Sequence, residues 1–179
     1  MATLIIAKYR EDITWIDDVS KEHKIVIYDK SDEPSEYIKL ENIGRESHTW
    51  LTHIVNNYDN LDEYNVFLQG HPQPHFGNWK EFDLQELKPL GEMIACSNDG
   101  SPQHQGLPLV NVYEQVMHNS KECPDRFLFC IGAQYVVPKE NILAYPKTFY
   151  QALLDMHYKE HLMPWVIERF WDLIWTNSL

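Results

Sequence analysis

The chain has 179 residues, enough for one domain that buries a substantial core without disulfides or metals. Its 15 Lys and Arg stand against 27 Asp and Glu, which gives a formal net charge of −12, and 44% of the residues are hydrophobic. This composition excludes a disordered chain. The negative charge argues against proteins that bind nucleic acid or anionic membranes, because both need clustered basic residues.

Cysteine usage and apolar segments predict a cytoplasmic protein. The three cysteines, Cys96, Cys123 and Cys130, are too few and odd in number for a disulfide framework. The apolar run Leu4–Ala7 is too short for a secretory signal. No stretch reaches the roughly 20 apolar residues of a membrane span.

The first 70 residues alternate predicted strands and helices. Apolar, β-branched runs predict strands at 3–8, 24–28, 37–40 and 66–69. Helices are predicted at 12–20, where Asp12 is a candidate N-cap, and at 47–58, where apolar residues recur at helical spacing. Such alternation is typical of βαβ units, so we expect a mostly parallel, Rossmann-like sheet flanked by helices.

Predicted elements continue to the end of the chain. A weaker strand at 93–96 is followed by a polar segment, about 96–108, that we expect to be a mobile loop, and by a helix at 110–118. Residues 127–137 have the strongest β signal, broken by Gly132. Pro146 and Pro164 each stand where a helix begins. The whole, 1–179, is interpreted as a single α/β domain.

In sheets of this kind ligands bind beyond the carboxyl ends of the strands, so the strand-end loops are candidate sites. The loop after the first strand contains Tyr9, Arg10, Glu11 and Asp12. An Arg beside a helix N-terminus suits a phosphate or diphosphate, and a helix cap with solvated charges explains the same residues.

A second strand-end loop, 69–75, reads QGHPQPH and is stiffened by two prolines. Its His71 and His75 are candidate metal ligands or an acid–base pair. A stiff turn with polar tips is the alternative. The third loop is Gly132–Gln134.

Helical segments carry further candidates. Arg45, Glu46 and His48 lie at the start of a predicted helix, either as site residues or as a cap with exposed charges. Glu168 lies on an otherwise apolar helix, where a carboxylate must face solvent, pair with a cation or serve a site. We expect its neighbour Arg169 on a different face.

Sequence motifs typical of several enzyme classes are incomplete or absent in this chain. Residues 157–161 match the H-x-x-E-H pattern of inverted zinc proteases, but no third ligand follows at the expected distance, so we expect a solvated helix end. The phosphate-binding and dinucleotide-binding glycine motifs, G-x-S-x-G and C-x-x-C do not occur. We therefore expect no organic cofactor.

Several segments together resemble one family. In chain order they are IIAKYREDITWI, IYDKS, NIGRESHTWLTHIVNNYDNL, VFLQGHPQPH, GAQYVVPKENILAYPKTFYQALL and ERFWDLIW. They resemble the uncharacterised family called domain of unknown function 3431, with GRESHT and FLQGHPxxH as the most specific motifs. That family implies no firm activity.

The layout also resembles a compact GT-A-type glycosyltransferase. The resemblance places Gln69-Gly70-His71 where that fold usually has an Asp-x-Asp metal motif, which this chain lacks. It assigns the acceptor side to Gly132, Ala133 and Gln134. It assigns Tyr9, Arg10, Glu11 and Asp12 to the nucleotide. Arg45 and Gln69 are further candidate residues of the donor site.

The leading hypothesis is therefore an enzyme that moves a sugar from a nucleotide-diphosphate sugar to a hydroxyl-bearing acceptor. Glu168 or Glu46 would deprotonate the acceptor. The charge of the leaving diphosphate would be stabilised by Mn²⁺ or Mg²⁺ at His71 and His75, or by arginines without a metal. The loop at 96–108 would close over the substrate.

Two alternatives remain open. The first is a metal-dependent hydrolase built on His71 and His75, with His48 as a further catalytic candidate. The second is a non-catalytic module that binds carbohydrate or protein. Its support is the aromatic content of 13%, including six Trp, since aromatic faces stack on sugars and anchor interfaces.

Overall fold

Strands alternate with helical segments over the first 70 residues, as predicted. The structure is a computed structural model that describes residues 1–19, 21–75, 84–117 and 122–178. The elements of this first part are β1 (Ala2–Lys8), the 3-10 helix η1 (Thr14–Asp18), β2 (Lys24–Asp29), β3 (Ile38–Lys39), α1 (Arg45–Asn57), the 3-10 turn η2 (Tyr58–Asn60) and β4 (Tyr64–Gln69).

Shorter strands and longer helices follow. They are β5 (Lys88–Pro89), β6 (Met93–Ser97), α2 (Leu109–Met117), β7 (Arg126–Cys130), the 3-10 turn η3 (Ile131–Ala133), β8 (Tyr135–Pro138), α3 (Lys139–Leu143), α4 (Lys147–Met156) and α5 (Met163–Trp175). No helix within the described ranges is long and apolar enough to cross a bilayer.

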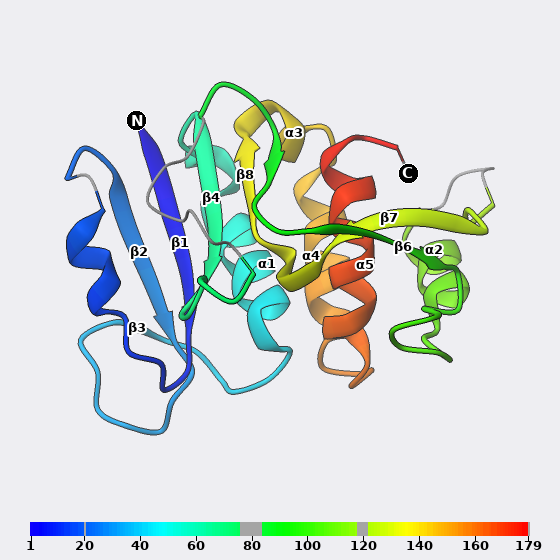
Figure 1. Ribbon diagram of the computed structural model, residues 1–179, viewed down its shortest axis with the longest axis horizontal. Helices are drawn as coiled ribbons and strands as arrows, with labels where there is room; N and C mark the ends of the chain where they lie inside the picture. Colours follow the sequence, from blue (N-terminus) through cyan, green and yellow to red (C-terminus); the bar gives the residue numbers. More distant parts are fainter. Residues whose placement is uncertain (20, 76–83, 118–121, 179) are drawn as a thin grey trace.

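The main sheet has six strands in the order β3-β2-β1-β4-β8-β5 (Figure 1). β3, β2, β1 and β4 are mutually parallel, with Ile5 of β1 opposite Val26 of β2 and Phe67 of β4. β8 runs antiparallel to both β4 and β5. The expected α/β fold with a mostly parallel sheet flanked by helices is therefore confirmed.

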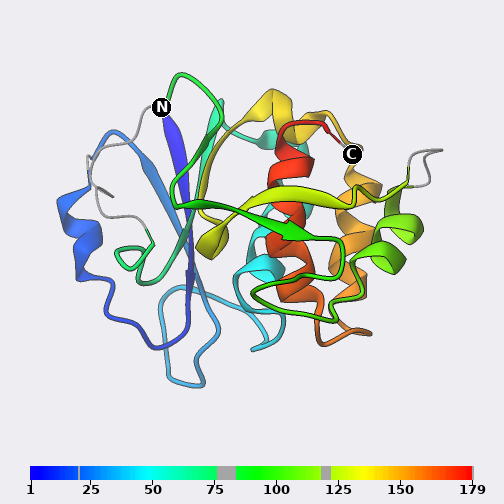
Figure 2. The same ribbon diagram turned by 45° about the vertical axis from the view of Figure 1, so that its right-hand side comes forward.

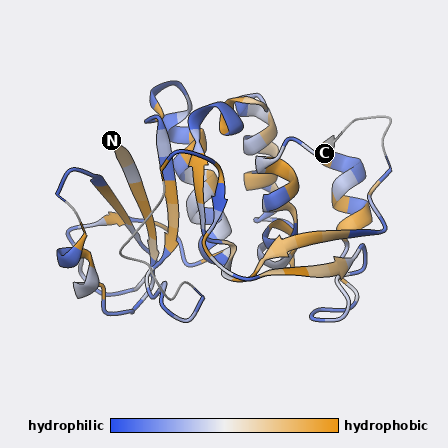
Figure 3. Ribbon diagram, turned by 45° about the horizontal axis from the view of Figure 1, so that its top comes forward, coloured by the Kyte–Doolittle hydropathy of each residue, from blue (hydrophilic) through white to orange (hydrophobic). Residues whose placement is uncertain are grey.

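Alternate residues of the central strands point to opposite sides of the sheet. Both sets are buried, so both faces of these strands are covered. One face packs on α1, α4 and α5, with Ile5, Phe67 and Val137 buried among helix residues such as Trp50 and Trp171 (Figure 2). In the hydropathy colouring of Figure 3 the central strands and the β6–β7 ribbon are mostly orange. The opposite face buries Leu4, Ile6, Val66, Leu68 and Val136 beneath Trp15 and Val19, in and beside η1.

The segment from β7 to β8 serves two sheets. β7 pairs antiparallel with β6 in a two-stranded ribbon that packs on α5, whereas β8 belongs to the main sheet. The predicted strand at 127–137 is thus split, and the predicted break at Gly132 is confirmed. Gly132 has a φ of +75°, a left-handed conformation that glycine adopts without strain.

The predicted helix at 12–20 is wrong in type and length. Only a 3-10 helix forms, at Thr14–Asp18, although Asp12 does cap it: its Oδ1 accepts the Thr14 backbone N–H at 2.9 Å. Trp15 explains the short helix, because its indole is buried and donates from Nε1 to the carbonyl of Gly70. This bond ties the segment to the residue that follows β4.

The predicted loop at about 96–108 folds back on itself. The backbone N–H groups of Gly106 and Leu107 both donate to the carbonyl of Asp99, at 2.8 and 2.9 Å. Leu107 is buried in the larger core. Its closure over a substrate stays a prediction.

Candidate functional site

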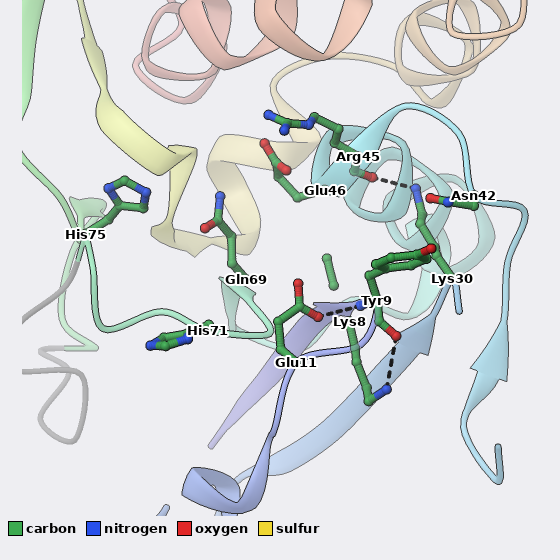
Figure 4. Close-up of a pocket in the computed structure, with 11 residues that line it drawn as sticks. Lys8, Tyr9, Glu11, Lys30, Asn42, Arg45, Glu46, Gln69, His71 and His75 are labelled. Carbon is green, nitrogen blue, oxygen red and sulfur yellow. Dashed lines mark hydrogen bonds between the residues drawn. The ribbon is translucent and has the colours of Figure 1, made fainter. Parts of the chain in front are cut away.

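A cavity lies at the carboxyl ends of β1 and β4. The chain leaves β1 to form β2 on one side, and β4 lies on the other side, so these two strands flank the point where the strand order reverses. Ligands of open α/β sheets bind at such a switch point. The cavity, here called the main cleft, has a volume of about 450 Å³ (Figure 4). It is lined by Ala7, Lys8, Tyr9, Glu11, Lys30, Asn42, Arg45, Glu46, Gln69, His71 and His75.

The β1 end of the main cleft is formed by Tyr9 and Glu11. The Glu11 carboxylate folds back and its Oε2 accepts the Tyr9 backbone N–H at 2.6 Å (Figure 4). Gly70 leaves room for this carboxylate, since a Cβ there would lie 2.9 Å from Glu11 Oε2. Arg10 instead points to Asp32 in an exposed ion pair of 2.7 Å, and Asp12 caps η1. These two predicted donor-site residues lie outside the lining of the cleft.

Lys30 is a buried cation in the main cleft that the sequence analysis missed. It follows the last residue of β2, is 6% exposed, and donates from Nζ to the carbonyls of Ile43 and Arg45. Burial lowers its pKa to about 7, against the opposing effect of the Glu46 carboxylate. Its position after a strand of the predicted parallel sheet was a signal that pointed to it.

The start of α1 brings Arg45 and Glu46 to the cleft. Gly44 and Arg45 both have left-handed backbone, with φ of +62° and +48°. That conformation is unusual for an arginine, and the Lys30 bonds to the carbonyls on both sides of Gly44 stabilise it. The Glu46 carboxyl is half-buried, and burial, with Glu168 nearby, raises its pKa.

A smaller cavity of about 110 Å³ adjoins the main cleft and shares four of its lining residues, Arg45, Glu46, Gln69 and His75. We call it the side cavity. Its remaining lining consists of Ile131, Gly132, Pro164, Trp165 and Glu168. Of these, Trp165 and Pro164 were not predicted as site residues, although an aromatic residue directly after the proline that opens a helix was visible in the sequence.

Glu168 is held in the side cavity by two donors. Its Oε1 accepts the backbone N–H of Gly132 at 3.1 Å, and its Oε2 accepts from the Arg169 guanidinium. Arg169 is 4% exposed and lies 4.3 Å from the centre of the Phe129 ring. Although Arg169 directly follows Glu168 in α5, its long guanidinium side chain reaches the carboxylate of its neighbour.

Gln69 and Gln134 tie the two strand-end loops together. Gln69 donates its side-chain amide to the carbonyl of Gly132 at 3.1 Å, and its backbone N–H donates to Gln134 Oε1 at 3.0 Å. Gln134 also donates to the carbonyl of Pro72. Gln134 and Ala133 are fully or almost fully buried, and of the three predicted acceptor-side residues Gly132 lines the side cavity, whereas the other two line neither it nor the main cleft.

The histidines separate into cleft residues and core residues. His71 and His75 both line the main cleft, and the His75 ring lies against Gly132, where a Cβ would come within 2.6 Å of it. His48 faces the other way, with Nε2 3.2 Å from the Tyr158 hydroxyl. Among the described residues no group of three or more His, Cys, Asp or Glu side chains is placed to hold a metal ion.

The H-x-x-E-H pattern does not form one histidine face. His157 is buried: its Nδ1–H donates to the carbonyl of Leu153, and its Nε2 accepts from the Ser47 hydroxyl at 2.7 Å. His161 has an 87% exposed side chain. The expected solvated helix end is therefore found for His161 but not for His157, which packs against Gly44 and so supports the start of α1.

Comparison with known proteins identifies a family without an assigned activity. A family model with the description "Protein of unknown function (DUF3431)" matches residues 4–93, half of the chain. This range includes the cleft residues from Tyr9 to His75, whereas Gly132, Trp165 and Glu168 lie beyond it. Searches of curated proteins and of solved structures returned no match. The chain belongs to the family of proteins of unknown function DUF3431.

Proposed function

We propose that the protein is a glycosyltransferase-like enzyme that transfers a sugar from a nucleoside-diphosphate sugar to a hydroxyl-bearing acceptor. One observation carries this proposal: the cleft at the switch point of the sheet combines cationic side chains with an adjoining cavity that contains carboxyl groups. Binding a diphosphate requires cationic side chains, and an acceptor hydroxyl that must lose a proton requires a carboxylate as base.

The donor half of the proposal rests on Lys8, Lys30 and Arg45. These cations line the main cleft together with the first turn of α1, and backbone N–H groups at a helix N-terminus favour phosphate. Tyr9, 38% exposed at the cleft, offers a ring on which a nucleobase can stack. Developing negative charge on the leaving diphosphate would be stabilised by Lys30 and Arg45.

The acceptor half rests on Glu168 and Glu46. The raised pKa of Glu46 favours its protonated form, so Glu168, whose carboxylate accepts from the Arg169 guanidinium and the Gly132 N–H, is the better candidate for the general base. Glu46 can then donate a hydrogen bond to the substrate.

Metal ions have an incomplete ligand set among the described residues. His71 and His75 supply two nitrogens in the cleft, whereas Mg²⁺ prefers oxygen ligands and no described third group joins the two histidines. Charge stabilisation is therefore assigned to Lys30 and Arg45. A metal-dependent hydrolase at His71 and His75 stays an alternative prediction, which elemental analysis of the purified protein tests.

The test of the proposed function is a thermal-shift panel. Uridine and guanosine diphosphates and their sugars are added with and without manganese, and nucleosides without phosphate serve as controls. We expect a diphosphate to raise the melting temperature, and Lys30→Met to abolish the shift while Lys147→Met, an exposed lysine at the start of α4, keeps it. Absence of a shift with every nucleotide would refute the proposal.

We also propose that the protein is cytoplasmic. The three cysteines are unpaired, two of them are buried, and burial raises the pKa of each thiol to about 11. Thiols held in the neutral form react slowly, so they have no evident redox role. Fluorescence microscopy of a tagged chain checks the location.

A further inference from the structure

The side cavity combines a flat aromatic side chain with a group of polar side chains. Trp165 is half-buried and faces this cavity together with Pro164 and Ile131. Around these apolar surfaces stand Glu46, Glu168, Gln69 and His75. An apolar face ringed by several hydrogen-bonding groups is the complement of a ligand whose ring has C–H groups on its faces and hydroxyls at its edge.

The carboxyl groups of the side cavity provide both kinds of hydrogen bond. Each Glu168 oxygen accepts one protein donor, from Gly132 or Arg169, and a carboxylate oxygen can accept two. One acceptor position on each oxygen therefore remains for a ligand. Glu46 lies on the same wall, and burial favours its protonated form, which can donate.

Most charged groups around the side cavity are paired or shifted towards the neutral form. Glu168 is paired with Arg169, and Arg45 lies beside Glu46, which burial shifts towards its neutral form. The charge that remains is that of Arg45, which also lines the main cleft, so the side cavity has no charged group of its own left to pair with a charged ligand, whereas a neutral polyhydroxyl ligand needs none. The cations Lys8 and Lys30 line only the main cleft.

Trp165 is held in place from two sides. The His104 ring packs against it at 5.2 Å between ring centres, and the Arg45 guanidinium lies 5.2 Å from the indole centre. Arg45 is an exposed side chain at the wall shared by both cavities. Its guanidinium can therefore leave the indole of Trp165 and bind a phosphate in the main cleft. The indole face would then be open to a ligand in the side cavity.

From this arrangement we propose that the side cavity binds a neutral pyranose ring, stacked on Trp165 and held by hydroxyl hydrogen bonds to Glu168 and Glu46. The inference rests on the proposed function in one respect, that this sugar is the acceptor of the transfer. Binding itself does not depend on that step. It names the acceptor class as a glycoside rather than a lipid, a protein side chain or a charged metabolite.

The experiment is saturation-transfer NMR on the full chain with methyl glycosides of glucose, galactose, mannose and xylose, each with and without uridine diphosphate. Cyclohexanol, a six-membered ring without vicinal hydroxyls, is the control ligand. We expect at least one glycoside to bind and Trp165→Leu to weaken it by about tenfold, with a smaller loss for Trp165→Phe, which keeps a flat ring. Tyr158→Leu, which removes an exposed aromatic side chain outside both cavities, serves as the matched control.

The outcomes separate this inference from the proposed function. Nucleotide stabilisation without glycoside binding, or glycoside binding equal in wild type and Trp165→Leu, overturns the side-cavity inference alone. Glycoside binding that depends on Trp165, in a protein that no nucleotide stabilises, supports a sugar site and refutes the transferase. Binding of neither class overturns both.

Discussion

Gly132 and Gly106 allow backbone strain to be separated from crowding at the cleft. Both have left-handed φ, of +75° and +87°. A Cβ at Gly132 would come within 2.6 Å of the His75 ring, whereas nothing lies within 4 Å of a Cβ at Gly106. Gly106→Ala therefore measures left-handed strain alone, about 1–2 kcal/mol.

We expect Gly132→Ala to lower the free energy of unfolding by more than Gly106→Ala does, because the strain is joined by the clash with His75. Urea denaturation measures both. In the double variant Gly132→Ala with His75→Ala, the excess should disappear. Equal losses for the two single variants would show that His75 moves aside at no cost.

Lys30 should make the stability of the protein depend on pH above neutral pH. In the folded protein burial lowers its pKa to about 7, from an ordinary value of 10.5. Between these values the unfolded chain binds more protons than the folded one, so this residue makes stability rise with pH, by up to about 1.4 kcal/mol per pH unit. The stability of wild type relative to Lys30→Met should therefore increase from pH 7 to pH 9 in urea denaturation. With Lys147→Met in its place, the difference should stay constant over that range.

The sequence predicted which residues lie near the cleft better than it predicted where their side chains point. The sequence placed Tyr9, Glu11, Arg45, Glu46, Gln69, His71 and His75 in strand-end or helix-start segments, and all of them line the main cleft. It did not show that Arg10 pairs with Asp32, that His48 faces the core, or that Lys30 turns inward. Those orientations depend on partners far away in the chain.

At the level of elements, aromatic stacking connects α5 with β4 of the main sheet. Trp175 stacks on Trp171 at 4.6 Å between ring centres and on Phe67 of β4 at 5.8 Å, and all three are almost fully buried. Trp175→Ala should lower the free energy of unfolding by about 3–5 kcal/mol. Trp165→Ala, a half-buried position on the same helix, should cost clearly less. Similar losses at both positions in urea denaturation would contradict this account of the attachment.

Long elements with strong periodicity were predicted well, as were the short strands β3 and β6, whereas β5 was not predicted and η1 was predicted as a longer helix. The apolar alternation of β1, β2 and β4 and the helical spacing in α1 and α5 are local signals. The split of 126–138 between two sheets is not local: β7 pairs with β6 and β8 with β4, and only the glycine at the joint indicated it. Likewise η1 stays short because Trp15 bonds to Gly70, 55 residues away.

For the whole molecule, three buried histidines predict acid sensitivity. Burial lowers the pKa of His48 to about 3 and those of His53 and His157 to about 4. As pH falls from 6.5 towards 4, the unfolded chain takes up protons that the folded chain excludes, so stability is lost across this window. Each histidine contributes up to about 1.4 kcal/mol per pH unit. Urea denaturation at pH 7, 6 and 5 measures the slope.

A single substitution tests this explanation of acid sensitivity. His53→Gln should reduce the slope by the share of one histidine, and its side chain still offers a partner to the Tyr28 hydroxyl, 3.0 Å from His53 Nδ1. His161→Gln, at a side chain 87% exposed, should leave the slope unchanged. If both variants behave like wild type, groups other than these histidines cause the acid loss.

The net charge of −12 also acts on the whole molecule. It repels a diphosphate at long range, so the cleft must attract it through local donors. Salt screens the long-range repulsion more than the contacts within the cleft. Binding of uridine diphosphate should therefore weaken less with added salt than it would for a basic protein.

The hydrogen bond from the Gly132 backbone N–H to Glu168 gives the side cavity a spectroscopic reporter. The chain has seven glycines, whose amide nitrogens have chemical shifts separate from those of most other residues. Because the Gly132 amide proton is bonded to Glu168, its chemical shift follows the ionisation and hydrogen bonding of that carboxylate. A single peak in a nitrogen–proton correlation spectrum can therefore monitor, without any label near the ligand, when Glu168 gains a proton or a partner.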